Sequence, residues 1–149
     1  RAEQVYGASR RQRSSALAIW HVLQSIHGVT LNAGRNQLRI TPRLPPGVSV
    51  LSTPVFTPGG LCWMKLRIDT GAAFRQQVHL SFDSPTTIAT VLMRVPPGAT
   101  KVRALAEMPD GPIPSTAELL PGEYYRLALI VLERSVHASS AFSIDLVAE

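Results

Sequence analysis

The spacing of apolar residues changes at Gly28, and this change constrains the fold more than any other feature of the chain. From Ser14 to His27, apolar side chains recur every three or four residues, which is the period of an amphipathic helix. Ser14 or Ser15 can cap the start of this helix, and Gly28 supplies the left-handed residue that commonly ends one. After Gly28 the apolar residues tend to alternate with polar ones, which predicts strands.

The region after Gly28 consists of short runs of branched and aromatic residues separated by Pro-Gly and Asp-Gly turns. The expected strands are Gln37–Thr41, Val48–Ser52, Leu61–Asp69, Arg75–Phe82, Thr86–Val95, Lys101–Ala106, Glu123–Leu132 and Ala141–Val147. Their number and spacing indicate a mainly β fold, an antiparallel two-layer β-sandwich of jelly-roll or immunoglobulin-like type preceded by one amphipathic helix. We expect an arm and helix over residues 1–30 and the sandwich over 31–149.

Two segments carry more apolar surface than an element that is exposed to solvent on one side would carry. The helix stripe contains Trp20 and spans almost half the circumference, so it needs a partner: the sandwich, a helical domain outside this chain, or another subunit. Residues Leu127–Leu132 are apolar on both faces, which predicts a central strand covered on each side. The chain opens on Arg1 rather than on Met, so we expect it to be a piece of a longer protein.

Charge is divided unevenly along the chain. Residues 1–43 hold seven arginines against Glu3 alone, a net of +6, whereas the remainder holds eight basic and nine acidic residues, a net of −1. No run approaches the roughly 20 apolar residues of a membrane span, so no membrane partner is expected. Cys62 is the single cysteine, which excludes an internal disulfide and leaves the compartment undecided.

Catalytic signatures are scarce in this sequence. It contains no nucleophile elbow, phosphate-binding glycine loop or zinc-binding histidine pair, so no cofactor and no metal are expected. The histidines are scattered, and we interpret each as an ordinary surface or boundary residue: His21, His27, His79 and His137. Three aspartates fall in turns, where their side chains bond nearby backbone N–H groups: Asp69, Asp83 and Asp110.

Three aromatic residues are candidates for a sugar-stacking platform: Trp63, Tyr124 and Tyr125. Trp63 alternates with Lys65 and Arg67 on the more polar face of its strand, so its ring is expected to face solvent. The alternative is that all three are ordinary half-buried sheet residues. A binding module that holds a sugar or a partner protein on one sheet face is therefore one hypothesis.

The first third of the chain resembles the last barrel helix of glycoside hydrolases with an (α/α)₆ barrel, of glucoamylase, debranching or rhamnosidase type. The similar segments are Glu3–Gly7, Ser15–Trp20, Leu23–Val29 and Leu38–Gly47. In such enzymes, a segment like the last of these begins a C-terminal β-sandwich. The resemblance implies a non-catalytic sandwich of a carbohydrate-active protein that gives structural support or contacts sugar. It also implies packing against a helical domain that this chain lacks.

If the comparison with glucoamylases holds, Glu3 matches the general base of that family. Such enzymes need a second carboxylate on the other side of the sugar ring. The barrel and the acid are not in this sequence, so the chain alone is expected to be inactive.

A second hypothesis is a viral coat-type jelly roll that self-assembles and contacts RNA through a basic N-terminal arm. The arm would use Arg10, Arg11 and Arg13. The charge division supports this alternative, whereas the strongly amphipathic helix argues against it.

Overall fold

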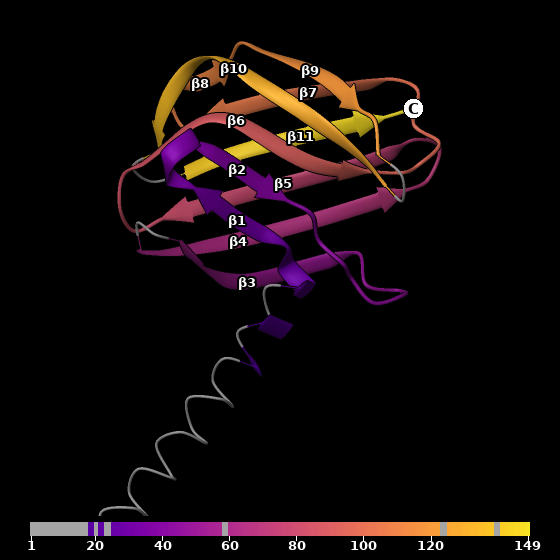
Figure 1. Cartoon of the computed structure of the whole chain (residues 1–149), viewed down its shortest axis with the longest axis horizontal. Coiled ribbons are helices and arrows are strands. Elements are labelled where there is room, and N and C mark those ends of the chain that lie inside the picture. The colour runs from indigo at the N-terminus through magenta and orange to yellow at the C-terminus, as the bar shows by residue number, and fades with distance from the viewer. Residues whose placement is uncertain (1–17, 20, 23–24, 58–59, 123–124, 139–140) are drawn as a thin grey trace, which may run out of the picture.

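The computed structural model describes residues 18–19, 21–22, 25–57, 60–122, 125–138 and 141–149, and they form two stacked sheets (Figure 1). Sheet A contains, in spatial order, β1 (Val29–Asn32), β2 (Gln37–Ile40), β6 (Thr86–Val95), β10 (Arg126–Ala138) and β9 (Ser115–Leu120). Sheet B contains β3 (Val50–Thr57), β4 (Gly60–Thr70), β5 (Phe74–Phe82), β11 (Ala141–Ala148), β7 (Val102–Met108) and β8 (Gly111–Ile113). A short 3₁₀ turn, Ala33–Arg35, joins β1 to β2.

This architecture confirms the predicted mainly β, two-layer sandwich with antiparallel strands. Among the strand pairs of the described residues, β2 with β6 is the parallel one, and the others are antiparallel. Strand β1 begins at Val29, before the boundary expected after residue 30.

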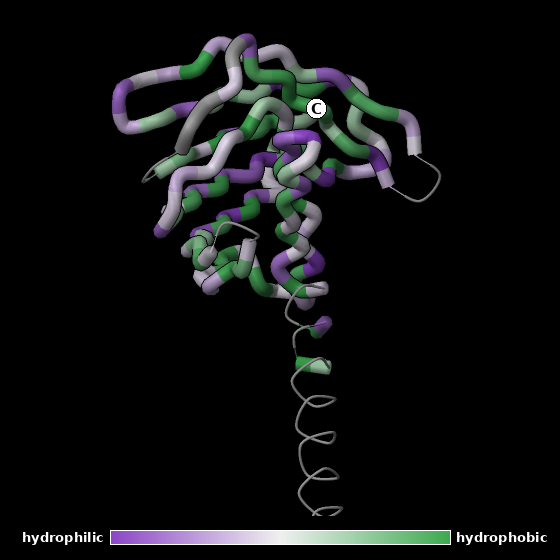
Figure 2. The backbone as a smooth tube through the Cα atoms, turned by 60° about the vertical axis from the view of Figure 1, so that its left-hand side comes forward, coloured by the Kyte–Doolittle hydropathy of each residue, from purple (hydrophilic) through white to green (hydrophobic). Residues whose placement is uncertain are grey.

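The core lies between the two sheets because each strand turns alternate residues toward it. Figure 2 shows this alternation of hydrophobic and hydrophilic positions along the strands. The largest fully buried apolar side chains come from both layers: Leu38, Ile40, Ile88, Met93 and Ile130 from sheet A, and Met64, Leu66, Leu80, Phe142, Ile144 and Leu146 from sheet B. Their burial supplies the main driving force for folding.

The predicted strand boundaries differ from the observed ones where turn residues enter strands. The strand predicted at Val48–Ser52 is observed as β3 and runs through Pro54, which is tolerated because β3 is an edge strand. The strand predicted at Glu123–Leu132 is observed as Arg126–Ala138. The sequence pattern does not predict the short strands β1, β8 and β9. Strand β8 begins within an Asp-Gly-Pro motif, which is typical of a turn.

The expectation that β10 is covered on both faces is wrong for the described part of the chain. Ala128, Ile130 and Leu132 are buried in the core, but Val131 on the opposite face is 39% exposed. Strand β10 lies between β6 and β9, and its outer side chains lie on the solvent face of sheet A.

The end of the N-terminal helix is fixed by backbone hydrogen bonds to the segment that follows β2. Residues 25–27 are helical, and Gly28 follows with φ of +61°, as predicted for a helix-ending glycine. The N–H of Arg43 donates to the Ile26 carbonyl at 2.9 Å, and the N–H of Thr41 donates to the Gly28 carbonyl at 3.0 Å. These bonds use carbonyl groups that a helix end otherwise leaves unpaired.

The exposed side of this helix has no cover from the sandwich. Ile19 is 61% exposed and Val22 is 58% exposed, and the described helical residues lead away from the sheets in Figure 1. Of the partners considered for the apolar stripe, the sandwich is therefore not the one that covers these two residues.

His27 departs from the expectation that the histidines lie at the surface or boundary. Its side chain is 4% exposed, and its Nδ1 accepts the N–H of Val29 at 3.0 Å. Burial lowers the pKa of His27, because a charged imidazolium would lose its hydration. The neutral ring thus caps the turn between the helix and β1.

Gly28→Ala should destabilise the protein far more than Gly47→Ala. Both glycines have positive φ, but a Cβ at Gly28 would lie 2.1 Å from the Thr41 carbonyl oxygen, whereas one at Gly47 would meet nothing within 4 Å. We expect a loss of about 1–2 kcal/mol at Gly47 from backbone strain alone and about 3 kcal/mol or more at Gly28. Urea denaturation measures both, and equal losses would contradict the close approach.

Stability should fall as the pH drops below 6.5, the ordinary pKa of histidine. Because the folded-state pKa of His27 is lower than its unfolded value, the unfolded chain binds more protons between the two values, which favours unfolding there. Calorimetric melting of wild type and His27→Gln from pH 8 to pH 5 measures this effect. The variant should show a flatter decline, and parallel curves would show that another group is responsible.

Candidate functional site

The outer face of sheet B carries a shallow hollow of about 430 Å³ above β4, β5, β11 and β7. Strand alternation points polar side chains into it while their sequence neighbours fill the core. The polar residues that line the hollow are Lys65, Arg67, Gln77, His79, Glu107, Ser143 and Asp145. The hollow is thus rich in hydrogen-bonding groups from four adjacent strands.

Asp145 organises one side of this hollow. Its carboxylate accepts from Arg75 Nε at 2.9 and 3.1 Å, from Arg75 Nη2, and from Gln77 Nε2 at 3.2 Å. The hydrogen bonds from Arg75 hold the pKa of Asp145 below its usual range. The carboxylate is therefore ionised and fixed in direction at neutral pH.

A second polar pair lies beside the first. Nδ1 of His79 on β5 is 2.8 Å from the hydroxyl oxygen of Ser143 on β11, its direct cross-strand neighbour. On the other side of β5, His79 is paired in register with Lys65. One row across the sheet thus brings an ammonium group, an imidazole and a hydroxyl together.

Trp63 lies on the same outer face, at one end of the polar rows. It is 49% exposed and precedes Lys65 by one strand repeat, so the prediction that its ring faces solvent is confirmed. Its cross-strand neighbours are Pro54 on β3 and Ser81 on β5. Phe56, 57% exposed, lies two residues beyond Pro54 on the same face. Two exposed aromatic side chains therefore lie on the same outer face as the hollow, beyond the row that contains Lys65.

Tyr125 lies elsewhere, next to sheet A. Arg39 Nη2 donates to its hydroxyl at 3.1 Å, and the guanidinium carbon of Arg94 lies 5.4 Å from the ring centroid. Arg39 belongs to β2 and Arg94 to β6. The structure therefore does not bring Tyr125 together with Trp63. One arginine lies over the ring of Tyr125 and another bonds its hydroxyl group.

The remaining predicted site residues lie outside the described residues. They are Glu3, Arg10, Arg11, Arg13 and Tyr124. Sequence reasoning missed Arg75, Gln77, His79, Ser143 and Asp145 as a group. The signal was the polar alternation of their two strands, but the pairing of β5 with β11 was not readable from it.

Cys62 is directed away from the hollow, into the core. It is fully buried, and burial raises the pKa of its thiol to about 12. The thiol is therefore protonated and unsuited to nucleophilic or metal chemistry. No group of three or more metal-ligating side chains occurs among the described residues. In the same part of the chain, no helix has the length and apolar content of a membrane span.

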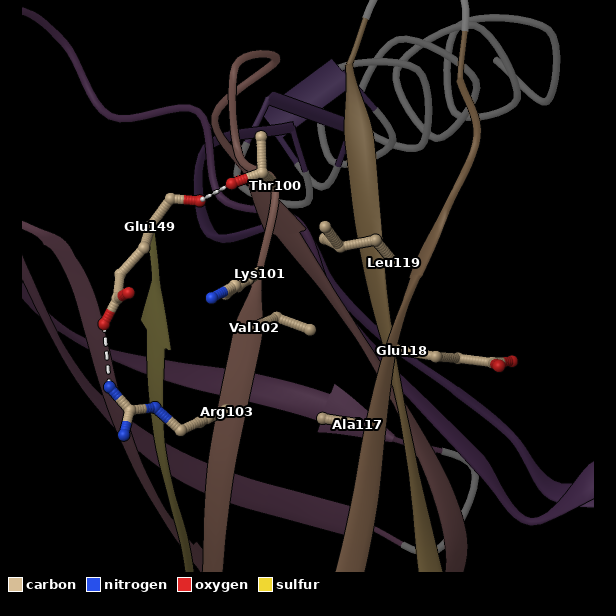
Figure 3. Close-up of a pocket in the computed structure, with 8 residues that line it drawn as sticks. All are labelled: Thr100, Lys101, Val102, Arg103, Ala117, Glu118, Leu119 and Glu149. Atoms are coloured by element: carbon tan, nitrogen blue, oxygen red, sulfur yellow. Dashed lines mark hydrogen bonds and ion pairs between the residues drawn. The ribbon is translucent and has the colours of Figure 1, made fainter.

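A second groove, of about 540 Å³, lies between β7 and β9 (Figure 3). Glu149 lines one side, where its carboxylate pairs with Arg103 at 2.7 Å and its carbonyl accepts from Thr100 Oγ1 at 3.2 Å. Val102, Ala117 and Leu119 contribute apolar surface, and Glu118 points away from the groove. The carboxylate of Glu149 is thus already paired with Arg103, and Lys101 adds a further charged group to the lining.

Comparison with known proteins gives one weak similarity. No family model and no curated protein matches the chain. The solved structure of an alpha-L-rhamnosidase from Dictyoglumus thermophilum is similar at 16% identity with a TM-score of 0.42. The match covers 83% of this chain but 12% of the rhamnosidase chain.

Cys62 should be labelled by iodoacetamide much more slowly in the folded protein than in the unfolded chain. The side chain is fully buried, and burial raises the pKa of its thiol to about 12, so little of the reactive thiolate is present. Mass spectrometry at pH 8 with and without guanidinium measures both rates, and no other thiol interferes. Comparable rates would show that Cys62 is accessible in the native state.

Proposed function

We propose that this chain is a non-catalytic β-sandwich unit of a carbohydrate-active protein and that the outer face of sheet B contacts a glycan. The observation that carries the proposal is the placement of half-exposed Trp63 on the outer face of β4, one strand repeat before Lys65, which lines a hollow rich in hydrogen-bonding side chains. Sugars present apolar ring faces and hydroxyl groups together. An aromatic plane beside fixed polar groups matches both.

The polar groups of the hollow suit hydroxyl recognition. Asp145 accepts, the amide of Gln77 donates and accepts, and Ser143 does both. Because Arg75 and Gln77 hold Asp145 in one orientation, little further ordering is required when a ligand binds. Val50 on β3 and Leu105 on β7 add exposed apolar surface at two opposite edges of the hollow.

The same geometry argues against Asp145 as a catalytic acid. Glycoside hydrolysis needs a protonated carboxylic acid as well as a carboxylate. Arg75 lowers the pKa of Asp145, which opposes the role of a general acid. A supporting role for the unit agrees with the sequence resemblance of residues 1–47 to the end of a helical barrel and the start of its sandwich.

Trp63→Ala should weaken glycan binding by about tenfold or more, because a buried aromatic contact commonly dominates such an interface. Isothermal titration with a panel of neutral oligosaccharides, on wild type and variant, measures the loss. Tyr125→Ala is the matched control, since it removes an aromatic ring next to the other sheet. That control should bind like wild type.

Two outcomes contradict the proposal. The absence of a heat change with every glycan would remove carbohydrate contact, provided that the melting temperature shows a folded protein. An equal loss in Trp63→Ala and Tyr125→Ala would show that the outer face of sheet B is not the site.

A further inference from the structure

One end of the sandwich core contains a pocket of about 180 Å³ that is separate from both grooves described above. Sheet B contributes three inward-facing residues, Ile68, Phe74 and Gln76. Sheet A contributes Pro42 after β2, Arg94 and Val95 at the end of β6, and Pro96 and Pro97 beyond it. The guanidinium group of Arg94 lies over the ring of Tyr125. The pocket thus lies between the two layers, and its walls are mostly rings and branched apolar groups.

Gln76 is the exceptional residue of this pocket. It is 1% exposed, and its Nε2 has no hydrogen-bond partner among the described residues. No other buried side-chain nitrogen or oxygen in the described part of the chain lacks a partner. In register, Gln76 lies between Ile68 and Leu146, which offer no side-chain acceptor. A buried amide donor is thus present where the protein provides nothing to receive it.

A hydrogen-bond acceptor that enters the pocket would give the Nε2 of Gln76 the partner that it lacks. One water molecule fills only about 30 Å³ of liquid and needs two to four polar partners. The lining supplies few of these, since all its residues except Gln76 and Arg94 have apolar side chains and the guanidinium group of Arg94 lies over Tyr125. A cavity of about 150 Å³ with apolar walls is large enough to hold benzene.

We propose that this pocket binds a small ring compound that carries one hydrogen-bond acceptor. The oxygen of the compound accepts the N–H of Gln76, and its ring packs against Phe74 and the prolines. This site is independent of the glycan face, because Gln76 and Gln77 point to opposite sides of β5.

Benzyl alcohol and toluene are the probes, since they share a ring and differ in one hydroxyl group. In wild type, the Gln76 side-chain amide signals in a ¹⁵N correlation spectrum should shift saturably with benzyl alcohol. Benzyl alcohol should bind about tenfold more tightly than toluene, the usual effect of one net hydrogen bond. Gln76→Leu should bind both equally.

Gln37→Leu is the control variant. Gln37 lies on β2, and its amide donates to Thr90 Oγ1 at 3.3 Å, outside the pocket lining. This variant should retain the preference for benzyl alcohol. If Gln76→Leu fails to fold, the wild-type amide signals still decide.

Three results would overturn the proposal. The first is the absence of a saturable shift of the Gln76 amide signals. The second is equal affinity of wild type for the two probes. The third is an unchanged preference for benzyl alcohol in a folded Gln76→Leu protein.

Discussion

Burial of one face of each sheet against the other is the constraint on which the rest of this structure depends. Every second residue of the central strands is committed to the core, as with Leu66, Leu80 and Ile144 of sheet B. The intervening residues are then necessarily on the outer face, where their chemistry is free to vary. The alternation that builds the core therefore also places Trp63, His79 and Asp145 on one surface.

The two outer faces use this freedom differently. Sheet B presents an ion pair and hydrogen-bonding groups around Asp145, with exposed Trp63 on the same face. Sheet A presents apolar side chains of β10, such as half-buried Leu129 and exposed Val131, near the pair formed by Arg94 and Tyr125. A polar face with fixed acceptors and donors suits a hydroxyl-rich ligand, which is why we propose sheet B as the glycan-binding face.

The sequence predicted local features well because they depend on neighbouring residues. The two-residue alternation predicted that Trp63 faces outward, and the φ of Gly28 agrees with its role at the helix end. The site could not be predicted, because Arg75 and Asp145 are 70 positions apart and meet only through the pairing of β5 with β11. The burial of His27 was not predicted because it follows from the docking of the helix end on the segment after β2, which no local pattern encodes.

The adjacent residues Gln76 and Gln77 show that the same side-chain amide has different consequences for stability on the two sides of one strand. Gln77 faces the hollow and donates to Asp145 at 3.2 Å, so its amide adds to an ordered polar surface. Gln76 faces the core with an unpaired nitrogen, at a cost of about 1–3 kcal/mol. An apolar residue at that position would avoid this cost, since the other inward residues of β5, such as Val78 and Leu80, are apolar. A stability loss confined to a residue that lines a pocket is the pattern expected of a binding group rather than of a packing group.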